Sequence, residues 1–169
     1  MCEIIDFEGI RIEAKVIGGH TEDLTWFRLV DEGLLHLVDT VHPAQAEFES
    51  FGMATDLGDY RRALEAARSS DWRVMTAGHG QIGWPSDIDL VLEYLKDLSS
   101  VVSASILANP PGAFTDAAQH RYKWFSARLI QVQNDSVAAL RPRWGELPGF
   151  DQACASHVHR MFLHLAYFE

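Results

Sequence analysis

Residues 10–43, IRIEAKVIGGHTEDLTWFRLVDEGLLHLVDTVHP, decide how this chain folds, because short apolar runs alternate in them with turn residues. The runs Ile10–Ile17, Leu24–Val30 and Leu34–Val38 have the length and the β-branched and aromatic content of strands. Asp31-Glu32-Gly33 separates the last two runs, and its glycine readily adopts the positive φ that a tight turn requires. The stretch therefore predicts strands, the last two of which form a hairpin.

Further elements are predicted on both sides of this stretch. Ile4–Phe7 and Arg73–Thr76 are additional strand-like runs, and Asp59–Arg68 has the composition of a helix. After Pro85 the apolar residues recur every three or four positions, which predicts helices over Pro85–Leu107, Thr115–Leu140 and Asp151–Tyr167. We expect Pro142 to end the second of these helices. We expect one α/β domain over residues 1–169, strand-rich over 1–84 and helical over 85–169.

Composition and charge exclude several classes of partner. The chain has 169 residues, of which 47% are hydrophobic, so it can bury a sizeable core. Its formal net charge is −10 and its basic residues do not cluster, which argues against nucleic acid and an anionic membrane as partners. The sequence shows no apolar stretch long enough to span a membrane and no export leader, so we expect a cytoplasmic protein. In that reducing compartment we expect Cys2 and Cys154 to be free thiols.

Three side chains that suit a metal ion each follow an expected strand. They are His20 in Gly19-His20-Thr21, Asp39 after Leu34–Val38, and His79 in Gly78-His79-Gly80. Imidazole and carboxylate together suit zinc, iron or manganese, and three ligands are enough for a mononuclear catalytic metal. Each residue also has a structural alternative: a loop histidine for His20, an Asx-turn or helix-cap acceptor for Asp39, and a tight turn for His79.

The order of these motifs resembles the C-terminal half of the metallo-β-lactamase superfamily. Val38–Pro43, the helix over Asp59–Arg68, and Glu93–Leu98 are also similar to that family. The resemblance implies an α/β fold, namely half of an αβ/βα sandwich with one mixed β-sheet and its helices, followed by C-terminal helices. It also implies a zinc site, with iron or manganese as alternatives, formed by His20, Asp39 and His79.

The activity implied by the resemblance is metal-dependent hydrolysis of a small molecule. The substrate would be an ester, thioester, amide or lactone, attacked by metal-bound water, with Asp39 and His79 as the catalytic residues. His42, beside Pro43, and Trp84, after the Gly-His-Gly loop, are the candidates for the substrate pocket. Both also have ordinary structural roles open to them, in a rigid loop and in the core.

The family's His-x-His-x-Asp-His motif is missing from the sequence. The His-x-His pair of this chain, His157-Val158-His159, falls in an expected helix, where positions two apart point about 200° apart and cannot close on one ion. A complete binuclear site therefore cannot be built from one copy. Two functions remain: a hydrolase completed by self-association or by a separately encoded N-terminal half, and a metal-free remnant that serves as a binding or structural protein.

The predicted half-sandwich also leaves one face of its sheet without a cover. Apolar side chains from Ile10–Ile17 and Leu34–Val38 would then contact water over more area than soluble monomers usually expose. The simplest cover is a second copy of the chain, related by a two-fold axis. We therefore predict a homodimer.

Overall fold

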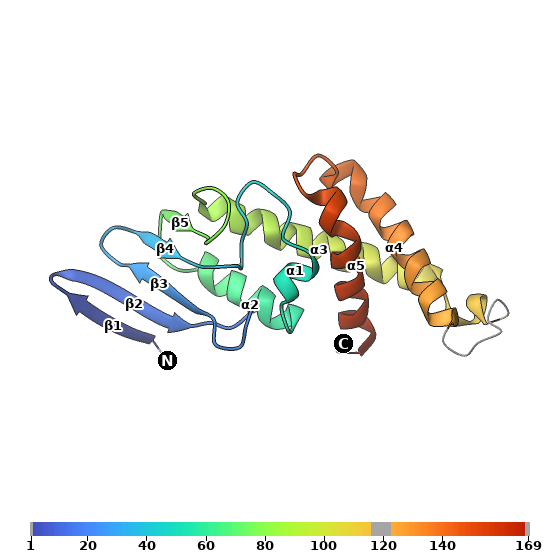
Figure 1. Cartoon of the computed structure of the whole chain (residues 1–169), viewed down its shortest axis with the longest axis horizontal. Coiled ribbons are helices and arrows are strands. Elements are labelled where there is room, and N and C mark those ends of the chain that lie inside the picture. Colours follow the sequence, from blue (N-terminus) through green and yellow to red (C-terminus); the bar gives the residue numbers. More distant parts are fainter. Residues whose placement is uncertain (1, 116–122, 168–169) are drawn as a thin grey trace.

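The computed structural model describes residues 2–115 and 123–167. A five-stranded sheet with the order β1-β2-β3-β4-β5 forms one end of the molecule, and the helices extend from it (Figure 1). Neighbouring strands are antiparallel from β1 to β4, whereas β5 runs parallel to β4. The strands are β1 (Cys2–Phe7), β2 (Ile10–Val16), β3 (Thr25–Leu29), β4 (Leu34–His36) and β5 (Val74–Thr76). The predicted mixed sheet is confirmed.

Six helical elements follow or interrupt the strands in the described ranges. They are α1 (Ser50–Met53), α2 (Leu57–Arg68), α3 (Pro85–Ala108), the 3-10 turn η1 (Pro111–Phe114), α4 (Lys123–Trp144) and α5 (Phe150–Tyr167). Helix α2 begins where the side chain of Asp56 accepts a 2.7 Å hydrogen bond from the Asp59 amide. Helix α3 begins at Pro85, where the Trp84 amide donates to the Asp87 carboxylate over 2.7 Å. None of these helices, as far as the structure describes them, is long and apolar enough to cross a membrane.

The core lies between one face of the sheet and the helices. Trp26, Leu35 and Met75 project from this face and are buried. They belong to the same core as Tyr60 of α2 and Ile88 of α3. Since large apolar side chains contribute most of the hydrophobic stabilisation, this contact fixes the two helices on the sheet.

The C-terminal half is a packed group of α3, α4 and α5 (Figure 1). The predicted helix over Thr115–Leu140 is described as α4 from Lys123, and the expected positions 116–122 lie outside the described residues. The predicted end at Pro142 is wrong, because α4 continues to Trp144. The last turn is held by Trp144, which is buried and donates from Nε1 to Asp97 over 3.0 Å. Arg143 adds contacts of 2.6 Å to both Glu93 and Asp97, which offset the hydrogen bond that the proline cannot make.

Candidate functional site

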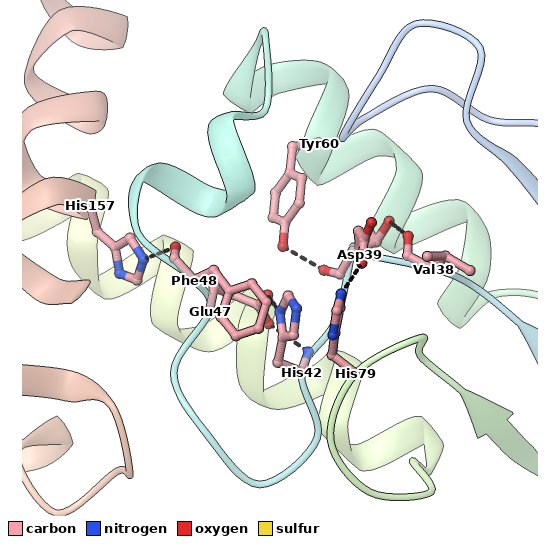
Figure 2. A network of polar contacts seen from close by, with 9 residues as sticks. Val38, Asp39, His42, Glu47, Phe48, Tyr60, His79 and His157 are labelled. Atoms are coloured by element: carbon pink, nitrogen blue, oxygen red, sulfur yellow. Dashed lines mark hydrogen bonds and ion pairs between the residues drawn. The ribbon is translucent and has the colours of Figure 1, made fainter. Parts of the chain in front are cut away.

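Asp39 and His79 are brought together by the parallel pairing of β4 and β5. Because parallel neighbours end at the same edge of a sheet, the loops that follow them leave side by side. Beyond the strands the ladder continues, with Leu37 N donating to Thr76 O over 3.0 Å and Asp39 N donating to Ala77 O over 3.1 Å. The structure thus places these two predicted site residues at one edge of the sheet (Figure 2).

The contact between the two side chains is close but is not an aligned hydrogen bond. Asp39 Oδ1 lies 3.0 Å from His79 Nε2. The same Oδ1 atom is shielded from solvent, and among the described residues it has no hydrogen-bond partner. Two atoms that each lie about 2.0–2.1 Å from a tetrahedral metal ion are about 3.3 Å apart, so this spacing is close to that of two ligands of one ion.

The backbone around the pair is held in left-handed conformations. Asp39 has a φ of 57°, which few residues other than glycine adopt. Gly78 has a φ of +81°, and a Cβ atom placed on it would lie 2.8 Å from Val38 Cγ1. A glycine is therefore required at position 78 for the His79 loop to approach the end of β4 this closely.

His20 lies in the loop between β2 and β3, against α1. A Cβ atom placed on Gly52 would be 2.9 Å from Cε1 of the His20 ring. The Nδ1 atom of His20 is buried and has no hydrogen-bond partner within the described chain. Over residues 2–115 and 123–167, no three His, Cys, Asp or Glu side chains form a group that could hold a metal ion. The structure therefore groups Asp39 with His79, whereas His20 does not join them in such a group, and the three-ligand set stays a prediction.

His42 is buried beside the pair and is held by Glu47. Its Nδ1 atom lies 2.5 Å from Glu47 Oε2, and its backbone amide donates to Glu47 Oε1 over 3.1 Å. Since a carboxylate accepts, the Nδ1–H group donates. The Nε2 atom is buried and has no hydrogen-bond partner in the described ranges. The ring centroid of His42 is 5.9 Å from that of His79, so His42 forms part of the wall of the site.

Phe48 completes this wall. Its ring centroid is 3.9 Å from that of His42 and 5.3 Å from that of His79. Phe48 also lines an open surface cavity of about 570 Å³ together with Glu49, Ser50, Met53 and Arg160. The predicted pocket residue Trp84 is 55% exposed and caps α3, so its role in a pocket stays a prediction.

Two hydrogen bonds, one buried and one partly buried, fix the loop between Thr40 and Phe48 (Figure 2). Tyr60 of α2 donates from its hydroxyl group to Thr40 O over 2.5 Å. Burial, reinforced by the negative charge of Glu47, raises the pKa of Tyr60 well above its ordinary value, so the phenol stays a neutral donor. From the other side, His157 Nε2 donates to Phe48 O over 2.9 Å.

The tautomer of His157 follows from its two partners. A carbonyl oxygen only accepts, so Nε2 carries the proton, and Nδ1 accepts a 3.0 Å hydrogen bond from the Tyr94 hydroxyl group. Burial lowers the pKa of His157 to about 4, because charge on a buried imidazole is not solvated. As predicted, His157 and His159 lie in a helix, α5. His157 thus joins the C-terminal helices to the loop of the site.

Sequence reasoning missed Glu47, Tyr60 and His157. Glu47 lies in an otherwise ordinary segment, and its only local signal is an acidic residue five positions after His42. The other two come from helices distant in the sequence, and nothing in their own neighbourhoods indicates a contact with this loop. These residues are recognised only from the fold.

No family model matches the chain, and no curated protein matches it either. Solved structures with a similar fold include a metallo-β-lactamase from Pontibacter korlensis, which is 23% identical, with 57% of this chain and 46% of that chain aligned at a TM-score of 0.51. A metallo-β-lactamase family protein from Thermus thermophilus is 18% identical over 83% of this chain and 47% of that chain, also at a TM-score of 0.51. The stereoselective inverting sec-alkylsulfatase Pisa1 from Pseudomonas sp. is 12% identical over 99% of this chain and 26% of that chain, at a TM-score of 0.51.

These similarities define the class of fold. The chain has a partial metallo-β-lactamase-like fold, built from a mixed five-stranded sheet followed by helices. It spans less than half the length of each of these three solved structures. The fold expected from the sequence resemblance is therefore confirmed.

Proposed function

We propose that this chain is part of a metal-dependent hydrolase and supplies Asp39 and His79 as two of its metal ligands. The observation that carries the proposal is the 3.0 Å separation of Asp39 Oδ1 and His79 Nε2, at an oxygen that accepts no hydrogen bond within the described chain. Two unprotonated atoms at this spacing repel each other unless a proton or a cation lies between them. Their close approach at the ends of adjacent strands therefore favours a cation site.

The described residues do not complete a metal site by themselves, because no group of three suitable side chains is present among them. The remaining ligands would come from a second copy, from a separately encoded N-terminal half, or from a rearrangement that brings His20 inward. A zinc, iron or manganese ion held there would provide the chemistry for hydrolysis of an ester, thioester, amide or lactone. The substrate would be a small molecule.

The chain's own residues would shape this site in defined ways. Glu47 holds the His42 ring through Nδ1, which fixes its orientation beside His79, and its other ring nitrogen, Nε2, is buried without a hydrogen-bond partner in the described chain. Phe48 excludes water from one side of His42 and His79. Tyr60 and His157 hold the loop in place from two helices, which keeps these side chains in a fixed geometry.

A second candidate is a metal-free protein with a binding or structural role. It is favoured by the lack of any group of three metal-competent side chains in the described part of the chain. In that case the close contact between Asp39 and His79 has a structural role only. The two candidates differ in metal content and can be separated without knowing a substrate.

The test is elemental analysis of purified protein after growth in zinc- or iron-supplemented medium. We expect bound transition metal in the wild-type protein, its loss in the His79→Ala variant, and its retention in the His159→Ala variant, which changes a histidine of α5. The control excludes a general effect of removing one imidazole. Wild-type protein without metal, or equal metal in both variants, would refute the proposed site and favour the metal-free role.

A hydrolase assay provides an independent check. A panel of activated esters, thioesters and lactones should reveal activity that a chelator abolishes and added metal restores. Activity that persists in the chelator, or an acyl group trapped on a serine or cysteine, would contradict a metal-dependent mechanism.

A further inference from the structure

One face of the sheet is mostly apolar. Residues directly opposite each other in antiparallel strands point to the same face. The pairs Phe7 with Ile10, Ile12 with Leu29, and Leu29 with Leu34 therefore share one side. Following the alternation along each strand, we define the open face by Ile5, Phe7, Ile10, Ile12, Ala14, Val16, Phe27, Leu29, Leu34 and Val74.

The open face is exposed because the helices cover the other side. Phe7 is 62% exposed, Val16 51% and Phe27 44%. The residues that alternate with them, such as Trp26 and Leu35, are buried in the core with the helices. The helices thus cover this second face at β3, β4 and β5, whereas at β1 it stays exposed, with Ile4 63% exposed.

The open face is also nearly free of charge, although the chain carries a net charge of −10. The charged residues of the strands alternate onto the opposite face, where Arg28 and Glu13 pair at 2.6 Å and Lys15 lies 5.0 Å from the ring centre of Trp26. Among the described strand residues on the open face, the carboxylate of Glu3 is the only full charge, at the margin. The half-buried His36 on this side contacts Thr76 Oγ1 at 2.7 Å.

The size of the open face suits a protein interface. The five strands hold 24 residues, and a spacing of about 4.8 Å between strands and about 3.4 Å per residue gives a projected face of about 390 Å². The relief of the side chains increases this area toward the roughly 600–800 Å² per partner that stable dimers bury. Apolar patches of this size on soluble proteins are often interaction sites.

We propose that a second copy of this chain covers the open face, so that two sheets pack face to face about a two-fold axis. A neutral apolar face is complementary to itself, because a copy brings neither unpaired charge nor like charge into the centre of the contact. A partner with a charged surface would find no opposite charge there. The net charge of each copy is screened over about 8 Å at physiological salt, so it opposes the contact only weakly. This inference does not depend on the proposed metal site.

The experiment uses two substitutions of equal exposure on one strand. Phe7 is 62% exposed on the open face, and Ile4 is 63% exposed on the opposite face of β1. Phe7→Glu would place a carboxylate in the contact, whereas Ile4→Glu places the same charge outside it. Phe27→Glu is a second variant at the centre of the open face, and circular dichroism checks that each variant is folded.

Light scattering and sedimentation equilibrium of the full chain, with and without a chelator, provide the readout. We expect a mass of twice 19.0 kDa for the wild-type and Ile4→Glu proteins at micromolar concentration in both conditions. We expect Phe7→Glu and Phe27→Glu to weaken dimerisation at least tenfold. Wild-type protein that stays at 19.0 kDa overturns the proposal and leaves the face for a different chain. Equal weakening by Ile4→Glu overturns it too, because association would then involve the strand edge and not the face.

Discussion

His157 in α5 donates a 2.9 Å hydrogen bond to the carbonyl oxygen of Phe48, a residue 109 positions earlier in the chain. The bond ties the C-terminal helices to the loop that carries His42, Glu47 and Phe48. It requires a neutral imidazole, since Nδ1 accepts at the same time from Tyr94. The helical part of the chain therefore supports the candidate site directly.

The protonation of His157 predicts how stability depends on pH. The pKa of His157 is about 4 in the folded chain, and an unfolded histidine has its ordinary value of about 6.5. Between these values the unfolded state binds the extra proton. Neutral His157 therefore contributes up to about 3 kcal/mol to the free energy of unfolding. This contribution is fully present above about pH 6.5 and is lost as the pH falls toward 4. Urea unfolding at a series of pH values measures this slope.

The matched variant is His157→Gln, whose side-chain amide can still donate to Phe48 O but does not titrate. We expect a clearly smaller loss of stability between pH 6.5 and 4 in this variant. An unchanged slope would show that other groups cause the acid sensitivity.

The close approach of the His79 loop to β4 predicts that Gly78→Ala is strongly destabilising. The new Cβ atom would lie 2.8 Å from Val38 Cγ1, at a φ of +81°. Gly9→Ala is the control, because Gly9 has a similar φ of +86° but no atom within 4 Å of the added Cβ. We expect about 1 kcal/mol of backbone strain in the control and a further 1–3 kcal/mol in Gly78→Ala, measured by urea unfolding. Equal costs would mean that the loop moves away freely.

Most elements of the fold could be predicted because their signals are local. Alternation in Ile10–Ile17 and the turn at Asp31-Glu32-Gly33 gave β2, β3 and β4 to within one or two residues at most ends. The end of α4 could not be predicted, because it depends on Asp97, a residue of another helix that holds Trp144. A proline favours the end of a helix, but the contact of Trp144 with Asp97 outweighs this local preference in α4.

The site was predictable only in part, for the same physical reason. Asp39 and His79 were identified from motifs next to strands, but their contact depends on the parallel pairing of β4 with β5. A parallel pair joins segments that are far apart in sequence and leaves no turn signature between them. The carboxylate of Glu47 was missed because its burial against His42 arises from the folded loop.

The Tyr60 hydroxyl group predicts a measurable contribution to stability. It donates to Thr40 O within the core, and Tyr60→Phe would leave that buried carbonyl group without this donor. We expect a loss of about 1–2 kcal/mol in the free energy of unfolding. Tyr167→Phe is the control, because Tyr167 is 66% exposed and should change stability very little. Equal stability of the two variants would mean that the Thr40 carbonyl group finds another donor.

Substitutions of Asp39 can distinguish a metal-binding role of this residue from a purely structural role. Its φ of 57° is tolerated by aspartate better than by most residues, and glycine adopts it without a steric cost. The amide of residue 39 donates to Ala77 O, so both Asp39→Gly and Asp39→Ala keep the ladder at the end of β4. We expect Asp39→Gly to be at least as stable as the wild-type chain and Asp39→Ala to be about 1 kcal/mol less stable than Asp39→Gly.

Both variants should lose bound metal, since each removes the carboxylate that faces His79. A variant that gains or keeps stability while it loses metal would indicate that position 39 holds a strained aspartate for binding. If Asp39→Ala is as stable as Asp39→Gly, the left-handed backbone carries no strain. If both variants keep their metal, Asp39 is not a ligand and its contact with His79 is structural. Urea unfolding and elemental analysis on the same preparations distinguish these outcomes.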